Sequence, residues 1–246
     1  MLNPRAIMMV LERARATAWF DKDSSFMQMD KLDKLIYMVS ASLDINNKVY
    51  DVSLPKLPIT IDTHVAYLGR TSWKLKTEIY FQGHSLPLVH GEQQCVLVDG
   101  HTKRPSLPPQ WWSDQFMGAL DQSGQPLIVP STKMPTDIAV AREEIKVLPS
   151  DADFYIHAGS ANYIKFVMDC YIQWHIKKYG FMVNGDPFRN LKSMAQSFKG
   201  EANIGDVLTV IFWPDSTKAD SFHFHVFKDE KLIHECFVEF FPTIQH

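Results

Sequence analysis

Apolar residues recur at helical spacing near the start of the chain, which predicts a first helix over residues 3–19. Asn3 is a favourable N-cap, and Pro4 fits the first helical position. Residues 21–34 are charged and rich in methionine, which indicates a loop or a short helix, and residues 35–52 are mixed in pattern. Alternating or apolar segments then predict strands at residues 58–68, 72–81 and 92–99.

A proline-rich region separates two parts of the chain. Residues 100–140 hold many of the prolines and few sustained patterns, which is typical of an extended connector. Beyond it, a short strand at 145–148 leads to a helix that begins near Ser160. Further strands are predicted at residues 194–198, 207–213, 221–227 and 234–240. We therefore divide the chain into an N-terminal half (1–112), a connector (113–144) and a C-terminal half (145–246).

The two halves have the pattern of an internal repeat. Asn3 at the first helix start corresponds to Gly159 at the second, and Cys95 near the end of the first half corresponds to Cys236. A strand precedes the helix in the second half, whereas none precedes Asn3, so we expect the first half to lack its first strand, as a truncated start would produce. A missing strand exposes an edge of the sheet, which something must cover.

Composition limits the classes of function. The chain has 246 residues, a net charge of −3 and 22% charged residues, which does not indicate a nucleic-acid or anionic-membrane partner. We expect no transmembrane helix and see no signal-peptide region. Three widely spaced cysteines predict reduced thiols in an intracellular protein, with a cytoplasmic location expected and import into an organelle left open. No Cys-x-x-Cys is present, which argues against structural zinc.

The segment from Asp151 to Tyr163 concentrates the candidate chemistry. Asp153 lies four residues before His157, and the second helix begins just beyond them, near Ser160. The amino end of a helix presents unpaired N–H groups and a partial positive charge, which suits it to a polarised carbonyl oxygen. The same segment also fits a plain junction between a loop and a helix, with a surface aspartate and histidine.

Four local motifs together resemble acyl-thioester hydrolases of the hotdog superfamily, and most of all the plant-type acyl-ACP thioesterases. The motifs are Asp153-x-x-x-His157-x-Gly159-x-x-x-Tyr163, Glu201-Ala-Asn-Ile-Gly-Asp206, Leu2-Asn3-Pro4, and Val96 to Pro105. The resemblance covers most of both halves. It implies an α+β fold made of two tandem hotdog halves, a double hotdog, in which antiparallel sheets surround two long helices and the site lies in the second half.

The resemblance also assigns roles to residues of the site. Asp153, His157 and Glu201 match the catalytic Asp, His and acidic positions of the family. Backbone N–H groups near Gly159 and Ser160 would stabilise an oxyanion, and either carboxylate would orient or deprotonate the attacking water. His157 would hydrogen-bond the thioester carbonyl or assist the proton transfer. Two positions depart from the family pattern, because the family has asparagine where this chain has Tyr155 and Gly159.

These assignments predict hydrolysis of fatty acyl thioesters of CoA or of acyl-carrier protein, without a metal or an organic cofactor and with a homodimer as one assembly. Two alternatives stay open. One is a double hotdog protein that binds acyl thioesters or lipids without turnover, and the other is a hotdog enoyl-thioester hydratase or dehydratase. His223 and His225 share one face of a predicted strand and permit a metal pair, but no third ligand is evident, so cross-strand packing is favoured.

Overall fold

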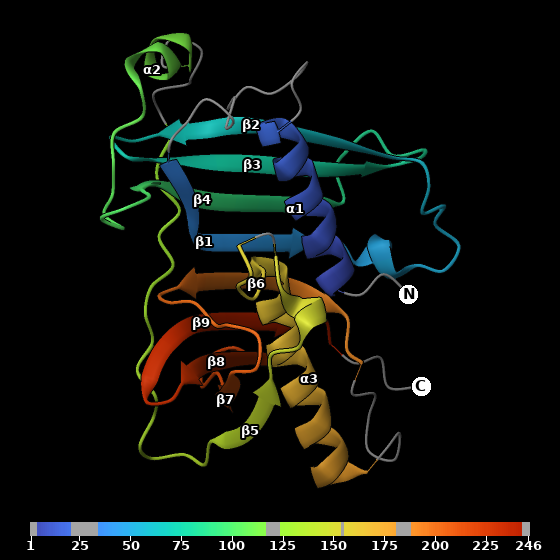
Figure 1. The fold of residues 1–246 in the computed structure, drawn as a ribbon. Coiled ribbons are helices and arrows are strands. Elements are labelled where there is room, and N and C mark those ends of the chain that lie inside the picture. Colours follow the sequence, from blue (N-terminus) through green and yellow to red (C-terminus); the bar gives the residue numbers. More distant parts are fainter. Residues whose placement is uncertain (1–3, 21–33, 117–123, 154, 181–187, 243–246) are drawn as a thin grey trace.

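Nine strands form one antiparallel sheet, and two long helices lie on one of its faces (Figure 1). The structure is a computed structural model that describes residues 4–20, 34–116, 124–153, 155–180 and 188–242. The strands are β1 (Lys34–Ile45), β2 (Ile59–Leu68), β3 (Ser72–Phe81), β4 (Val89–Asp99), β5 (Ala141–Lys146), β6 (Leu191–Phe198), β7 (Val207–Pro214), β8 (Ser221–Lys228) and β9 (Lys231–Phe240). The helices are α1 (Pro4–Phe20), α2 (Gln110–Phe116) and α3 (Ser160–Tyr179). The predicted α+β class is therefore confirmed.

A helix followed by four strands occurs twice, as α1 with β1 to β4 and as α3 with β6 to β9. The order across the sheet is β2-β3-β4-β1-β6-β9-β8-β7-β5, so β1 and β6 join the two units at its centre. In this order each strand of the first unit has a counterpart at the same distance from the junction. β5 pairs with the outer side of β7, whereas among the described residues no strand pairs with the outer side of β2.

The strand β1 is the main element that the hydrophobic pattern missed. It occupies residues that are mixed in pattern, although it is 12 residues long and lies between β4 and β6. The pairing with β4 shifts between Met38 and Ser40, so a bulge reverses the alternation of side chains in the middle of the strand. A period of two therefore does not continue along β1. Residues 21–33, predicted as a loop or short helix, and the Asn3 cap lie outside the described residues.

The other predicted elements differ from the structure mainly at their ends. The first helix begins at Pro4 and the second at Ser160, as the pattern predicts. β5 begins at Ala141, inside the segment assigned to the connector, and α2 spans the other end of that segment. The segments at these ends are short or weakly patterned, so the sequence defines the ends of the helices and strands poorly there.

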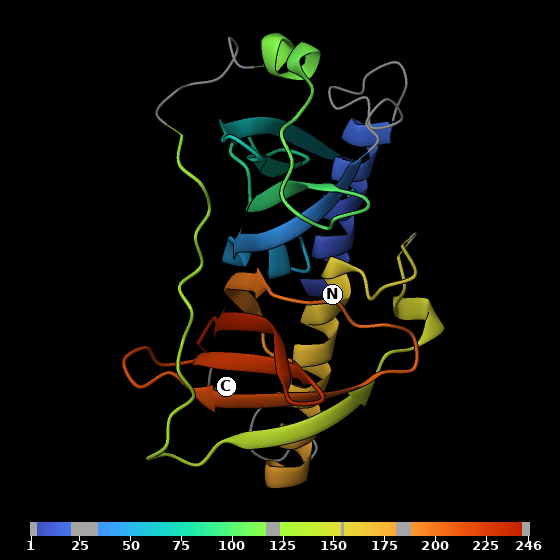
Figure 2. The same cartoon turned by 60° about the vertical axis from the view of Figure 1, so that its left-hand side comes forward.

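One apolar core under both helices joins the two units. It contains fully buried side chains from α1, from β1 at the junction and from α3, such as Met8, Leu43 and Ile164. The segment of residues 124–140 runs along the opposite face of the sheet, as Figure 2 shows. There the Leu127 carbonyl accepts from the Ser40 hydroxyl over 2.7 Å, and the Ser131 hydroxyl donates to Glu235 over 2.6 Å. Among the described helices, none is long and apolar enough to cross a membrane.

Candidate active site

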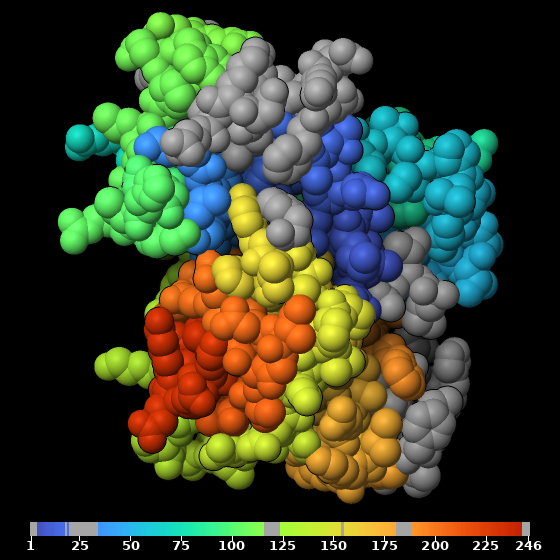
Figure 3. Space-filling view, in the orientation of Figure 1, coloured from blue at the N-terminus to red at the C-terminus, as the bar shows by residue number. Residues whose placement is uncertain are grey.

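A cavity of about 1130 Å³ lies where α1 and β1 meet the segment that leads into α3. In the space-filling view that segment, in yellow, lies at the surface between α1, in blue, and the orange chain near residue 200 (Figure 3). The cavity therefore draws its walls from both helix-and-strand units. Most of the lining residues come from four parts of the chain, namely α1, β1, residues 153–163 and residues 198–201, and Lys103 and Lys231 complete the lining.

A tight turn places Asp153 and His157 on the same side of the cavity. The Asp153 N–H donates to the His157 carbonyl over 2.8 Å, and the Ile156 N–H donates to the Asp153 carbonyl over 3.0 Å. Ile156 completes the turn with a φ of +65°, in the left-handed region. This region is costly for a β-branched residue. The turn thus brings together two side chains that the sequence spaces four residues apart.

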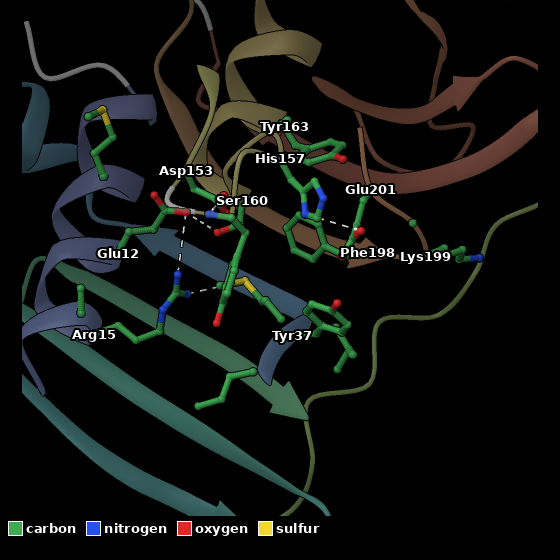
Figure 4. A pocket seen from close by; sticks show the side chains of 18 of the residues that line it. Glu12, Arg15, Tyr37, Asp153, His157, Ser160, Tyr163, Phe198, Lys199 and Glu201 are labelled. Atoms are coloured by element: carbon green, nitrogen blue, oxygen red, sulfur yellow. Dashed lines mark hydrogen bonds and ion pairs between the residues drawn. The ribbon is translucent and has the colours of Figure 1, made fainter. Parts of the chain in front are cut away.

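The same turn is held against the segment that carries Glu201. The Ala158 N–H donates to the Ala202 carbonyl over 2.8 Å, and His157 forms an isolated antiparallel bridge with Asn203. As a result, Glu201 Oε2 lies 3.5 Å from His157 Nδ1, as the dashed line in Figure 4 marks. The structure therefore brings the two motifs quoted above into one site, although 44 residues separate His157 from Glu201 along the sequence.

Glu201 also contacts the first unit, through Tyr37 on β1. Burial raises the pKa of the Tyr37 hydroxyl, and the Glu201 carboxylate, which accepts a hydrogen bond from this hydroxyl, raises it further. Glu201 is thus placed between an imidazole and a phenol. A carboxylate in this position favours the orientation of the histidine ring in which Nδ1 faces it.

Asp153 has the electrostatic environment of a proton acceptor. The residue as a whole is exposed, yet partial burial of its carboxyl raises its pKa, and the nearby Glu12 carboxylate raises it further. The backbone N–H of Tyr155, which donates to Asp153 Oδ1 over 2.8 Å, and the nearby His157 lower the pKa by less. A carboxyl group whose pKa is raised toward neutrality is a stronger base than an ordinary surface aspartate.

The amino end of α3 is arranged differently from the sequence-based expectation. Gly159 precedes the helix with a φ of −60°, and its N–H already donates to the Asp151 carbonyl over 2.9 Å. The next donors are the Ser160 hydroxyl and the Ala161 N–H. Both donate to the carboxylate of Glu12 on α1, the Ala161 N–H over 2.7 Å. Ser160 therefore faces the cavity, whereas the Gly159 N–H is used within the turn.

Sequence reasoning missed Glu12 and Tyr37. Glu12 is a single acidic residue on the first helix, and its hydrogen-bond partners lie 148 and 149 residues further along the chain. Arg15 lies one turn beyond it on α1, with Nη2 3.9 Å from Glu12 Oε1. No local spacing could have indicated either residue, because both enter the site from the opposite half.

Tyr155, one of the two departures from the family pattern, also links the halves. Its hydroxyl is hydrogen-bonded to the main chain of Ile36 on β1, and burial raises its pKa. The tyrosine thus anchors the turn of Asp153 and His157 to the first unit. Tyr163, at the end of the same motif, is buried and lines the cavity, and its ring packs at a tilt of 32° against His234, with 4.7 Å between the ring centroids.

Other reactive side chains lie outside the cavity. All three cysteines are buried, and burial raises the pKa of Cys95 to about 11 and that of Cys170 to about 12, which makes them poor nucleophiles. His223 Nε2 lies 2.6 Å from Asp215 and His225 Nε2 lies 3.3 Å from Glu235. Across the described part of the chain, no group of three or more His, Cys, Asp and Glu residues is placed to hold a metal ion.

Comparisons with known proteins agree with this architecture. No protein-family model matches the chain, and no curated protein matches its sequence. Among solved structures, one described as an oleoyl thioesterase from Lactobacillus plantarum superposes with a TM-score of 0.76 at 12% identity, over 99% of this chain and 90% of that one. The 12:0-ACP thioesterase from Umbellularia californica gives 0.71 at 13% identity, over 98% and 90% of the two chains.

A third similar structure is an acyl-ACP thioesterase from Bacteroides thetaiotaomicron, with a TM-score of 0.68 at 16% identity over 96% of this chain and 89% of that one. Identities this low establish the fold, and all three matches extend over nearly the whole chain. The chain therefore has the hotdog fold of these thioesterases.

Proposed function

We propose that the protein hydrolyses fatty acyl thioesters to a free acid and a thiol. The observation that carries this proposal is the convergence of Asp153, His157 and Glu201 on one cavity at the amino end of α3. We further propose that the two helix-and-strand units are tandem hotdog halves. In this arrangement the first half supplies α1 and β1 as one wall of the site, and the second half supplies the acid and base groups.

The proposed reaction follows from where these groups lie. The thioester carbonyl oxygen binds the Ser160 hydroxyl and the Ala161 N–H, where the amino end of α3 stabilises negative charge. Asp153 takes a proton from a water molecule, and the resulting hydroxide attacks the carbonyl carbon. The tetrahedral intermediate then collapses, the carbon–sulfur bond breaks, and His157 protonates the departing thiolate. Glu201 orients His157, and the proton that Asp153 took from water passes to His157 before the next turnover.

The cavity lining supports an acyl chain. Apolar side chains of α1 and β1 line the part of the cavity between these two elements: Met9, Val10, Trp19, Ile36, Met38 and Val39. Unbranched methionine side chains adapt to irregular apolar ligands. A saturated chain entering from the catalytic turn would therefore lie between α1 and β1, in the first half.

The rim of the cavity supports a carrier that bears phosphate. Arg13, Lys103 and Lys231 line the cavity and are exposed, and no carboxylate of the described residues forms an ion pair with any of them. Phosphate groups pair well with arginine and lysine. Both CoA and the prosthetic arm of acyl-carrier proteins contain phosphate, so either carrier fits this rim.

The direct test is thiol release from acyl-CoAs and acyl-carrier proteins of different chain length. Wild type is compared with Asp153→Asn and Glu201→Gln, and with Glu144→Gln as a control that removes an exposed carboxylate on β5. Turnover that is lost in the site variants and retained in the control supports the proposal. A change in the absorbance of an enoyl thioester without thiol release would instead identify a hydratase, and binding without either reaction would identify a binding protein.

A further inference from the structure

The carboxylate of Glu12 occupies the position where the proposed reaction needs the substrate carbonyl. It accepts hydrogen bonds from the Ser160 hydroxyl, which lies beside it in Figure 4, and from the Ala161 N–H. Ala161 is 1% exposed, so a ligand reaches its N–H only by replacing Glu12. The two donors at the amino end of α3 are therefore occupied by the Glu12 carboxylate, which comes from the opposite half of the chain.

Hydrogen bonds hold the Glu12 carboxylate at the amino end of α3, but a second partner, Arg15, lies close to it. A carboxylate at a helix amino end is stabilised by the helix dipole and by charge-assisted hydrogen bonds. Arg15 Nη2 lies 3.9 Å from the same oxygen of Glu12. Arg15 is itself held in place, with Nη1 3.9 Å from Met38 Sδ and its guanidinium 5.0 Å from the Trp19 ring centroid. Glu12 can therefore leave α3 and stay paired with a cation.

We propose that Glu12 is a specificity-determining residue that exchanges with the ligand at the amino end of α3 and selects neutral carbonyl oxygens over carboxylates. This inference rests on the proposed function for its physiological meaning. A neutral thioester carbonyl displaces Glu12 toward Arg15 and adds no charge to the site. A carboxylate adds a third negative charge beside Glu12 and Asp153, and like charges in one site disfavour each other.

The consequence concerns release of the product. Hydrolysis converts the neutral thioester into a carboxylate, which has the same chemistry as the Glu12 side chain and competes with it for the same two donors. Glu12 then returns to Ser160 and Ala161 and displaces the acid. The residue would therefore weaken binding of the product relative to that of the substrate.

The test measures binding of two dodecyl probes by calorimetry, dodecanoate and a neutral methyl ketone of the same length. In wild type the ketone binds more tightly than the carboxylate. Glu12→Gln removes the charge and keeps the shape, so we expect it to tighten binding of dodecanoate by about tenfold. Binding of the ketone should change by much less, since it gains only from weaker competition by the amide. Glu144→Gln, which removes a carboxylate outside the cavity, should change neither affinity.

The ratio of the two affinities separates this proposal from a purely structural role. If Glu12 only caps α3, Glu12→Gln weakens the binding of both probes to the same extent or changes the binding of neither. Either outcome overturns the inference. A wild type that binds dodecanoate more tightly than the ketone overturns it as well, even if the variant does not fold. Thiol release from wild type judges the proposed function separately. If wild type releases thiol and Glu12→Gln leaves the ratio of ketone to dodecanoate affinity unchanged, only the role of Glu12 is rejected. If the variant changes this ratio but wild type releases no thiol, only hydrolysis is rejected.

Discussion

Replacing Asp153 with asparagine removes the group that takes a proton from water in the proposed mechanism and leaves the turn around it intact. Asparagine keeps a side-chain oxygen that can accept from the Tyr155 N–H, which donates to Asp153 Oδ1 over 2.8 Å. Loss of a positioned general base lowers a rate by about 10²- to 10⁴-fold. This range corresponds to about 3–5 kcal/mol of activation free energy. We therefore expect kcat for thiol release to fall by this factor, with Tm close to that of wild type.

The pKa of Asp153 also sets the direction of the pH dependence. Burial is the largest influence and raises the pKa above the usual value for aspartate, against the opposing hydrogen bond from the Tyr155 N–H. Because a base acts only when it is deprotonated, kcat/KM should rise with pH through this raised pKa and be lost as the pH falls below it. In Asp153→Asn this acidic limb should disappear from the profile.

The assay follows thiol release with a chromogenic thiol reagent over a range of pH. Asp137→Asn serves as the matched control, because Asp137 is exposed on the connector and outside the cavity. The reasoning is refuted if Asp153→Asn keeps kcat within about threefold of wild type, which is far less than loss of a general base produces. It is also refuted if the acidic limb is unchanged in the variant.

Three further predictions concern the turn, the rim and the core. Ile156 has a φ of +65° and is 67% exposed, so Ile156→Asn should raise the free energy of unfolding in urea by about 1 kcal/mol; a decrease would show that the turn is not strained. Lys103→Ala and Lys231→Ala should each raise KM for acyl-CoA by up to about fivefold at low salt with kcat unchanged, and added salt should abolish the effect. Leu43 is fully buried on β1, so Leu43→Ala should lower the free energy of unfolding by about 2–5 kcal/mol in one cooperative transition, whereas two separate transitions would contradict a shared core.

The parts of the fold that the sequence predicts are those where burial follows a simple period. β3 alternates between buried and half-buried residues along its whole length, and the segment 72–81 was predicted with the bounds that the structure has. β1 shows why other parts could not be predicted. Its bulge after Met38 reverses the alternation, and it lies between two strands that pair with it from distant parts of the chain. That pairing belongs to the tertiary structure, which no local pattern describes.

The candidate site likewise contains residues that the sequence predicts and residues that only the structure reveals. Asp153, His157 and Glu201 lie in short motifs whose spacing is visible in the sequence, and the structure places all three at one cavity. Their catalytic roles stay predictions. Glu12 and Tyr37 reach the site from the other half through contacts of high sequence separation, so they could be found only after the halves were placed together. The sequence also does not show that the Gly159 N–H, which was expected near an oxyanion, is used within the turn, where it donates to the Asp151 carbonyl.

The central claim is that water cleaves an acyl thioester in this cavity, and isotope incorporation tests it most directly. Wild-type protein is incubated with an acyl-CoA and an acyl-carrier protein in H₂¹⁸O, and the acid product is analysed by mass spectrometry. Hydrolysis at the carbonyl carbon places one ¹⁸O atom in the carboxylate for each thiol released, and Asp153→Asn should form little of this product. Absence of labelled acid from either carrier, over a panel of chain lengths, would contradict the claim.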